Sequence, residues 1–220
     1  WERNGLKFFT PDGGLEGSDI ATLLEKAENI NIDGIVADST KLTDVDYMSD
    51  YAAHLREMIK KGVNAENYEK PLEGFKIIVD AGNGVGGFYA ENVLKPLGAD
   101  TEGSQFLEPD GMFPNHIPNP ENADAMKSIC SAVINSKADF GIIFDTDVDR
   151  AGCVDRDGEE INRNRLVALA SYIALEGHDS GVIVTDSVTS DGLKTYIESI
   201  GGEHYRVRSE ERFSRNAETD

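Results

Sequence analysis

The segment Asp-Thr-Asp-Val-Asp-Arg at residues 145–150 places three carboxylates at alternate positions, directly after an apolar run at 140–144. Alternate residues of an extended chain point to the same side, so the three side chains can converge on one point. Crowded carboxylates repel one another unless a cation neutralises them, and hard oxygen ligands select Mg²⁺, Mn²⁺ or Ca²⁺ over zinc. The last residue, Arg150, carries a planar cation that suits a phosphate group. The candidate metal ligands are therefore Asp145, Asp147 and Asp149.

Two other interpretations of this acidic segment are weaker. A solvated acidic loop is common in a chain of this charge, but uncompensated carboxylates at the end of a buried strand are costly. A calcium-binding EF-hand loop needs glycine at its sixth position and a bidentate glutamate at its twelfth, and Arg150 and Arg156 stand there instead. The element in front of the segment is also predicted to be a strand and not a helix.

A glycine-rich turn at residues 82–87 follows another predicted strand and satisfies the G-x-G-x-x-G pattern of dinucleotide-binding proteins. Asp80 precedes the turn, where it would bring a carboxylate near any approaching pyrophosphate. No acidic residue clearly ends the next strand about 20 residues further on, where a ribose contact is expected. We therefore interpret the glycines as a tight turn that lets a helix and a strand pack closely.

Strands separated by helices of 10–15 residues predict βαβ units and an α/β fold with a mixed, mostly parallel sheet sandwiched by helices. The expected strands are 6–9, 75–79, 140–144, 151–155 and 181–185, with a weaker one at 101–107. The expected helices run from Ser18 to about Ile30, from a capping box at Thr43 and Asp46 to about Lys61, and over 87–97, 122–135, 165–176 and 190–200.

Composition excludes several classes of partner. The net charge of −20 over 220 residues argues against a nucleic-acid binder and against docking on anionic lipid. No apolar run approaches the roughly 18 residues of a membrane-spanning helix. We expect Cys130 and Cys153 to be small buried hydrophobes rather than a disulfide, which favours an intracellular, cytoplasmic or organellar, location. A start at Trp1 indicates a fragment.

Four segments of the sequence carry motifs that belong together: Asn4–Lys7, Val79–Gly86, Asp110–Glu121 and Phe144–Arg150. Together they resemble the α-D-phosphohexomutase superfamily, which includes phosphoglucomutases, phosphomannomutases and phosphoglucosamine mutases. They occur in the order found in that family, and they cover most of residues 1–160. The resemblance implies the metal-binding α/β domain two at 41–160, a remnant of domain one at 1–40, and the start of domain three with a divergent tail at 161–220.

The resemblance also implies a reaction. Family members use a phosphoserine and Mg²⁺ to move phosphate between C1 and C6 of a hexose or hexosamine phosphate, through a hexose 1,6-bisphosphate. Carried over to this chain, the three aspartates of the acidic segment bind Mg²⁺ and Arg150 faces the reacting phosphate or sugar. Lys7 matches the lysine proposed as a general acid/base, and the substrate is a sugar phosphate.

The chain departs from the family pattern at several points. The nucleophilic serine would precede Trp1, so we expect the fragment alone to be inactive. Thr146 stands where glycine is usual, and its Cβ restricts the backbone of the metal loop. Asn119 stands between two prolines where the family usually has aspartate, and residues 209–220 do not read as a continuation of domain three.

Three alternatives stay open at this point. The first is a haloacid dehalogenase-like, Mg²⁺-dependent phosphatase with Asp145 as its nucleophile, because a strand followed by Asp-x-Asp also opens that family. The second is an acidic metal-binding or interaction module without catalysis, and the third is a dinucleotide-binding domain. Neither the particular hexose nor the oligomeric state follows from the sequence.

Overall fold

The computed structural model describes residues 6, 8–11, 13–34, 36, 38–178 and 180–207. Lys7 and the divergent tail at 209–220 lie outside the described residues. The chain divides into two compact units, Trp1–Asp50 and Tyr51–Asp220. Among the helices in these described ranges, none combines the length and the apolar character that a bilayer crossing requires.

The first unit contains a short antiparallel pair, β1 (Phe9–Thr10) and β2 (Gly13–Gly14), followed by the helix α1 (Gly17–Asn29). No residue of α1 is buried. The helix begins before the predicted cap at Ser18, because Glu16 is the N-cap and its backbone N–H donates to the carboxylate of Asp19 at 3.1 Å. A 3₁₀ turn at Ser39–Lys41 follows α1 along the chain.

The helix α2 (Tyr47–Val63) starts later than the capping box at Thr43 predicts. Asp46 is the capping residue, since its side chain accepts from the backbone N–H of Ser49 at 3.2 Å and from the Ser49 hydroxyl at 2.6 Å. The helix also continues to Val63, past the predicted end at about Lys61. The capping oxygen that lies nearest the helix therefore decides where α2 begins.

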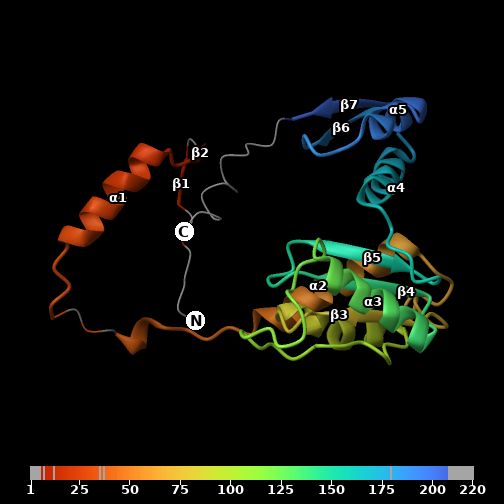
Figure 1. Ribbon diagram of the computed structural model, residues 1–220, viewed down its shortest axis with the longest axis horizontal. Coiled ribbons are helices and arrows are strands. Elements are labelled where there is room, and N and C mark those ends of the chain that lie inside the picture. The colour runs from red at the N-terminus through yellow and green to blue at the C-terminus, as the bar shows by residue number, and fades with distance from the viewer. Residues whose placement is uncertain are drawn as a thin grey trace. The chain divides into compact units, whose positions relative to one another are not determined.

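The central sheet of the second unit has the order β3-β4-β5, formed by β3 (Ile77–Asp80), β4 (Phe140–Phe144) and β5 (Ala151–Asp155). β3 and β4 are parallel and β5 is antiparallel to β4, so the sheet is mixed as predicted (Figure 1). The weak strand expected at 101–107 is reduced to two parallel bridges to the outer side of β3, Lys76 with Asp100 and Asp80 with Gln105.

Two layers of helix cover this sheet. On one face, α3 (Ala123–Ser136) packs its buried Ile129 and Val133 against Ile78, Ile143 and Val154 of the strands. On the other face, Val79 and Phe144 pack against the helical segment at 85–97, which in turn contacts Ala52 of α2. Successive strand residues thus point to opposite faces, and the predicted sandwich of helices around the sheet is confirmed.

The helix predicted at 87–97 is not a regular α-helix. It is a 3₁₀ turn (Val85–Gly87), a π-helical stretch (Tyr89–Leu94) and a second 3₁₀ turn (Lys95–Leu97). Pro96 has no N–H to donate to the carbonyl of Asn92 four residues before it, and that carbonyl instead accepts from Nη1 of Arg56 at 2.6 Å. The proline explains the irregular winding, and α2 supplies the missing donor.

The remaining elements are a two-stranded sheet and two helices. β6 (Gly181–Thr185) and β7 (Gly202–Arg206) are parallel and are joined through α5 (Asp191–Ser199), while α4 (Arg163–Leu175) precedes them. Asn162 and Ser190 cap the two helices through side-chain oxygens. The sequence predicts β6 and both helices, but it does not predict β7.

Gly87 of the glycine turn allows the close packing of this turn against the backbone of Leu107 to be tested. A Cβ built on Gly87 would lie 2.0 Å from the backbone carbonyl oxygen of Leu107, whereas one on Gly62 of α2 has nothing within 4 Å. We expect Gly87→Ala to lower the free energy of unfolding by about 1–3 kcal/mol, because neither backbone can move aside easily. The matched control Gly62→Ala should be neutral or stabilising by about 0.5–1 kcal/mol. Urea denaturation of both variants checks this, and equal stability of the two would contradict it.

Candidate metal centre

Three carboxylates converge just beyond the end of β4. Asp145 follows the last strand residue and its side chain is 1% exposed, whereas Asp147 and Asp149 are exposed. One carboxylate oxygen from each of the three lies within 4.8 Å of the others. Within the described ranges, this is the one group of three or more acidic, histidine or cysteine side chains close enough to share an ion. The expected convergence of the alternate aspartates is therefore present in the structure.

Arg150 closes the acidic loop on its first residue. Its backbone N–H donates to Oδ1 of Asp145 at 3.0 Å, and its Nε donates to Oδ2 at 2.8 Å. In the other direction, the backbone N–H of Asp145 donates to the carbonyl of Arg150 at 3.1 Å. Burial opposes ionisation of Asp145, but hydrogen bonds from the Arg150 backbone and its charged side chain prevail and lower the pKa of that carboxyl.

The opposite shift occurs at Asp149. Hydrogen bonding to Asp145 and the negative charges of Asp145 and Asp147 raise the pKa of the Asp149 carboxyl, and the guanidinium of Arg150 at 3.6 Å offsets this only in part. Asp145 and Asp147 therefore oppose ionisation of the Asp149 carboxyl. A cation placed between the carboxylate oxygens would stabilise their ionised forms.

The glycine turn supports the acidic loop through the main chain. The backbone N–H of Val85 donates to the carbonyl of Thr146 at 3.0 Å. A Cβ built on Gly84 would lie 2.7 Å from that same carbonyl oxygen, and one on Gly86 would lie 2.9 Å from the ring of Phe144. This geometry agrees with the interpretation of the glycines as a close-packing turn.

The unusual backbone conformation of the metal loop is at Val148 and not at Thr146, where the sequence led us to expect a restriction. Thr146 does not have a positive φ, whereas Val148, two residues on, has φ +67°. A β-branched residue is seldom found in this left-handed region, which costs on the order of 1–3 kcal/mol. Val148 is held there by packing against the buried cluster that contains Phe144. The threonine is thus tolerated because the unusual conformation belongs to its neighbour.

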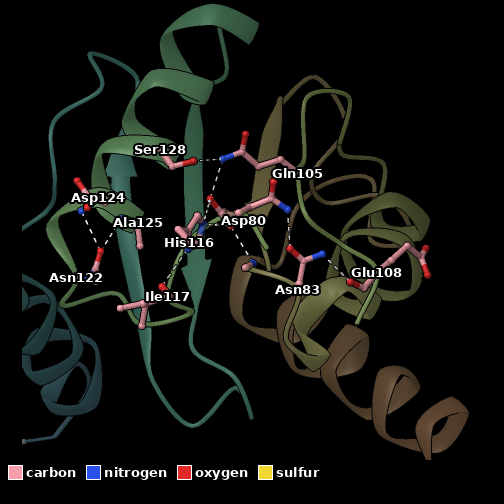
Figure 2. Close-up of polar contacts among 12 residues, drawn as sticks. Asp80, Asn83, Gln105, Glu108, His116, Ile117, Asn122, Asp124, Ala125 and Ser128 are labelled. Carbon is pink, nitrogen blue, oxygen red and sulfur yellow. Dashed lines mark hydrogen bonds and ion pairs between the residues drawn. The ribbon is translucent and has the colours of Figure 1, made fainter. Parts of the chain in front are cut away.

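A buried polar network that the sequence did not predict lies at the end of β3, next to the acidic loop. Asp80 is fully buried, and its carboxylate accepts from the N–H of Gly82 at 2.9 Å and from Nε2 of Gln105 at 2.7 Å (Figure 2). Nε2 of His116 lies 3.0 Å from Oδ1 of Asp80. Gln105 also donates to the hydroxyl of Ser128 on α3 at 2.8 Å. A polar residue between an apolar strand and a glycine turn was the available signal for this network.

Side chains of the proline-containing loop at 108–120 complete the surroundings. Asn83 donates through Nδ2 to the carbonyl of Glu108 at 2.9 Å and accepts at Oδ1 from Asn115 at 2.7 Å. Nη1 of Arg150 donates to Oδ1 of Asn119 at 3.3 Å. The loop, the glycine turn and the acidic segment are therefore in direct contact. Of the predicted site residues, Arg150 and the three aspartates are together, and Lys7 lies outside the described residues.

The cysteines stay separate from this site. Cys130 and Cys153 are both free thiols in partly buried positions. Burial raises the pKa of each thiol, and at Cys130 nearby acidic side chains, including Glu160, raise it further. Neither thiol is suited to act as a nucleophile at neutral pH.

Residues 49–158 match a family model described as "Phosphoglucomutase/phosphomannomutase, alpha/beta/alpha domain II", and this range is half of the chain. The chain belongs to the phosphoglucomutase/phosphomannomutase family. The predicted resemblance is thereby confirmed, and so is the predicted class of fold.

Relatives with curated names agree with this assignment. A phosphoglucomutase of Neisseria meningitidis serogroup A is 32% identical over 97% of this chain and 44% of its own length. A phosphoglucosamine mutase of Pseudoalteromonas atlantica is 32% identical over 96% of this chain and 45% of its own length. A phosphomannomutase/phosphoglucomutase of Pseudomonas aeruginosa (strain PAO1) is 30% identical over 90% of this chain and 40% of its own length. The chain thus spans less than half the length of these relatives.

A solved structure agrees as well. A phosphoglucomutase/phosphomannomutase family protein from Burkholderia thailandensis superimposes with a TM-score of 0.60 and 26% identity, over 74% of this chain and 35% of that one. The relatives named here are all mutases, so they give no support to the haloacid dehalogenase-like alternative with Asp145 as nucleophile.

The bond between Arg150 and Asp145 predicts a pH-dependent loss of stability. Arg150→Leu removes the charged donor from a buried carboxylate, and we expect it to lower the free energy of unfolding at pH 7 in EDTA by about 1–2 kcal/mol, since solvent screens the half-exposed guanidinium. Because the pKa of Asp145 is lowered in the folded state, this stabilisation is present above the unfolded pKa of about 4. It should disappear as the pH falls through the lower folded pKa.

The control is Arg163→Leu, which breaks an exposed ion pair with Glu121. Its cost should stay below about 0.5 kcal/mol and change little with pH. Denaturation curves between pH 3 and 7 measure both variants. A deficit of Arg150→Leu that is the same at pH 3 as at pH 7 would contradict the assigned role of the bond.

Proposed function

We propose that this chain is the metal-binding part of a phosphohexomutase, in which Asp145, Asp147 and Asp149 hold Mg²⁺ beside the phosphate of a sugar phosphate. The observation that carries the proposal is the convergence of three carboxylates at the end of β4. Family membership adds the reaction class, because relatives of this chain are named phosphoglucomutase, phosphomannomutase and phosphoglucosamine mutase.

The donor set suits Mg²⁺. The three ligands offer hard carboxylate oxygens, which this ion prefers over nitrogen or sulfur. One carboxylate oxygen of each aspartate lies within 4.8 Å of the others, so side-chain rotations would let one ion reach all three. Asp147 and Asp149 are exposed and free to make them, while Asp145 is fixed by Arg150. When bound, the ion supplies positive charge that stabilises the transferring phosphoryl group.

Arg150 is the chain's own cation at this site. Its Nε is held by Asp145 and its Nη1 by Asn119, and its side chain is still 54% exposed. The outer edge of the guanidinium can therefore bind a phosphate oxygen without leaving these partners. Fixing the group in advance avoids reorganisation during the reaction, which is how charged groups stabilise a phosphoryl-transfer transition state. We assign this role to Arg150.

The finer assignments follow from the family resemblance. We propose that Lys7 acts as a general acid/base and that the parent enzyme moves phosphate between C1 and C6 of a hexose or hexosamine phosphate by way of a phosphoserine. We also propose a remnant of domain one at 1–40, domain two at 41–160 and the start of domain three at 161–220. The range 49–158 of the family model falls within the second of these.

Magnesium titration tests the metal site. We expect wild-type chain to bind Mg²⁺ at one site, and Asp147→Asn to weaken that binding tenfold or more because it removes one charged ligand. The control Asp157→Asn makes the same change at an exposed position in the turn after β5. Calorimetry, or competition with Mn²⁺ followed by electron paramagnetic resonance, gives the affinities. Equal Mg²⁺ affinities of the two variants would contradict the assignment of Asp147 as a metal ligand.

Turnover is the second test. The chain of 220 residues should not interconvert glucose 1-phosphate and glucose 6-phosphate in a coupled assay, because it spans less than half the length of its curated relatives. In the full-length parent, Asp147→Asn should lower kcat by about 10²–10³-fold, while Asp157→Asn leaves it unchanged. Mutase turnover by the purified chain would refute the first expectation.

A further inference from the structure

Asp80 and His116 form a contact between two buried side chains close to the acidic loop. The Asp80 side chain is completely buried and that of His116 is 5% exposed, with Nε2 at 3.0 and 3.1 Å from the two carboxylate oxygens. The second ring nitrogen, Nδ1, lies 3.0 Å from the carbonyl of Ile117, and the ring packs edge-to-face on Phe106. Both nitrogens of the imidazole therefore have polar partners, and the ring itself packs against an aromatic side chain.

One connection runs from this pair to the start of the acidic loop. Asp80 holds the N–H of Gly82, the first residue of the glycine turn, in a left-handed conformation with φ +53°. Three residues on, the N–H of Val85 donates to the carbonyl of Thr146 at 3.0 Å. Both contacts are made by the same short turn, which therefore links Asp80 to the backbone of Thr146.

A second connection runs to the end of the acidic loop. His116 anchors the proline-containing loop, and Pro118 lies so close to Gly82 that a Cβ on that glycine would be 2.9 Å from the proline Cβ. The next residue, Asn119, accepts from Nη1 of Arg150 at 3.3 Å. The pair thus supports the acidic loop at Thr146 on one side and at Arg150 on the other.

We propose that Asp80 and His116 form a positioning unit that holds the Asp145–Asp149 loop in the conformation that binds the metal. The inference rests on the metal role proposed above, and it adds two residues that lie outside the group of three carboxylates. Residues of this kind, which orient the groups around a ligand, commonly change metal affinity by about 10–100-fold when altered.

A matched pair of substitutions separates this role from simple packing. In His116→Gln, the amide Nε2 can donate to Asp80 much as the imidazole Nε2 does, whereas His116→Leu keeps bulk and removes the donor. Val93→Ala is the control, because Val93 is fully buried in a different cluster, with Ala52 and Leu97, and touches neither loop. The affinity for Mg²⁺ is measured at a temperature at which all variants are folded, as checked by circular dichroism.

We expect His116→Leu to weaken Mg²⁺ binding at least tenfold, His116→Gln to restore it to within about threefold of wild type, and Val93→Ala to lower the melting temperature without changing the affinity. Amide hydrogen exchange without metal gives an independent measurement. The amides of Val85 and Arg150, which bond to the loop, should exchange about tenfold faster in His116→Leu than in His116→Gln.

The outcomes are distinguishable. If wild type binds Mg²⁺ and His116→Leu binds it equally well, the positioning role is overturned while the proposed metal site stands. If wild type binds no Mg²⁺, the proposed metal site fails. In that case unchanged exchange at Val85 and Arg150 overturns the positioning role as well, whereas faster exchange retains the pair as the support of the loop's conformation.

Discussion

Two neighbouring parallel strands, β3 and β4, end in carboxylates that have almost no contact with solvent. Asp80 and Asp145 are 0% and 1% exposed, and a buried carboxylate is tolerated only when hydrogen-bond donors surround it. Four parts of the molecule supply these donors: the glycine turn, Gln105 and the proline-containing loop at Asp80, and Arg150 at Asp145. The glycine turn, the proline-containing loop and Arg150 also contact the acidic loop or close it, so the need to satisfy two buried carboxylates arranges the candidate site.

Part of this organisation could be predicted from the sequence. The apolar run at 140–144 became β4 over the same residues, and the helical spacing after Asn122 became α3. The alternate aspartates could be placed on one side because the period of an extended chain is local information. Their electrostatic strain could also be anticipated from their crowding, and the opposite pKa shifts of Asp145 and Asp149 agree with it.

Other features depend on partners that are distant in the chain. The π-helical winding at Tyr89–Leu94 needs Arg56 to satisfy the carbonyl that Pro96 leaves open. Asp80 is contacted from Gln105 and His116, which are 25 and 36 residues away, and no periodicity in the sequence indicates that they meet. Strand β7 was missed because its apolar residues are few, and its pairing with β6 decides its structure.

The main-chain bond between Val85 and Thr146 bears on which positions of the molecule can vary. Where two backbones cross this closely, only one of them has to lack a side chain on the side of contact, and here that one is Gly84, whose Cβ would meet the Thr146 carbonyl at 2.7 Å. Since the carbonyl and not the threonine side chain makes the bond, many residue types can occupy position 146 with the crossing intact. Substitution at 84 is far more restricted, so among descendants of this sequence we expect drift at 146 and retention of glycine at 84.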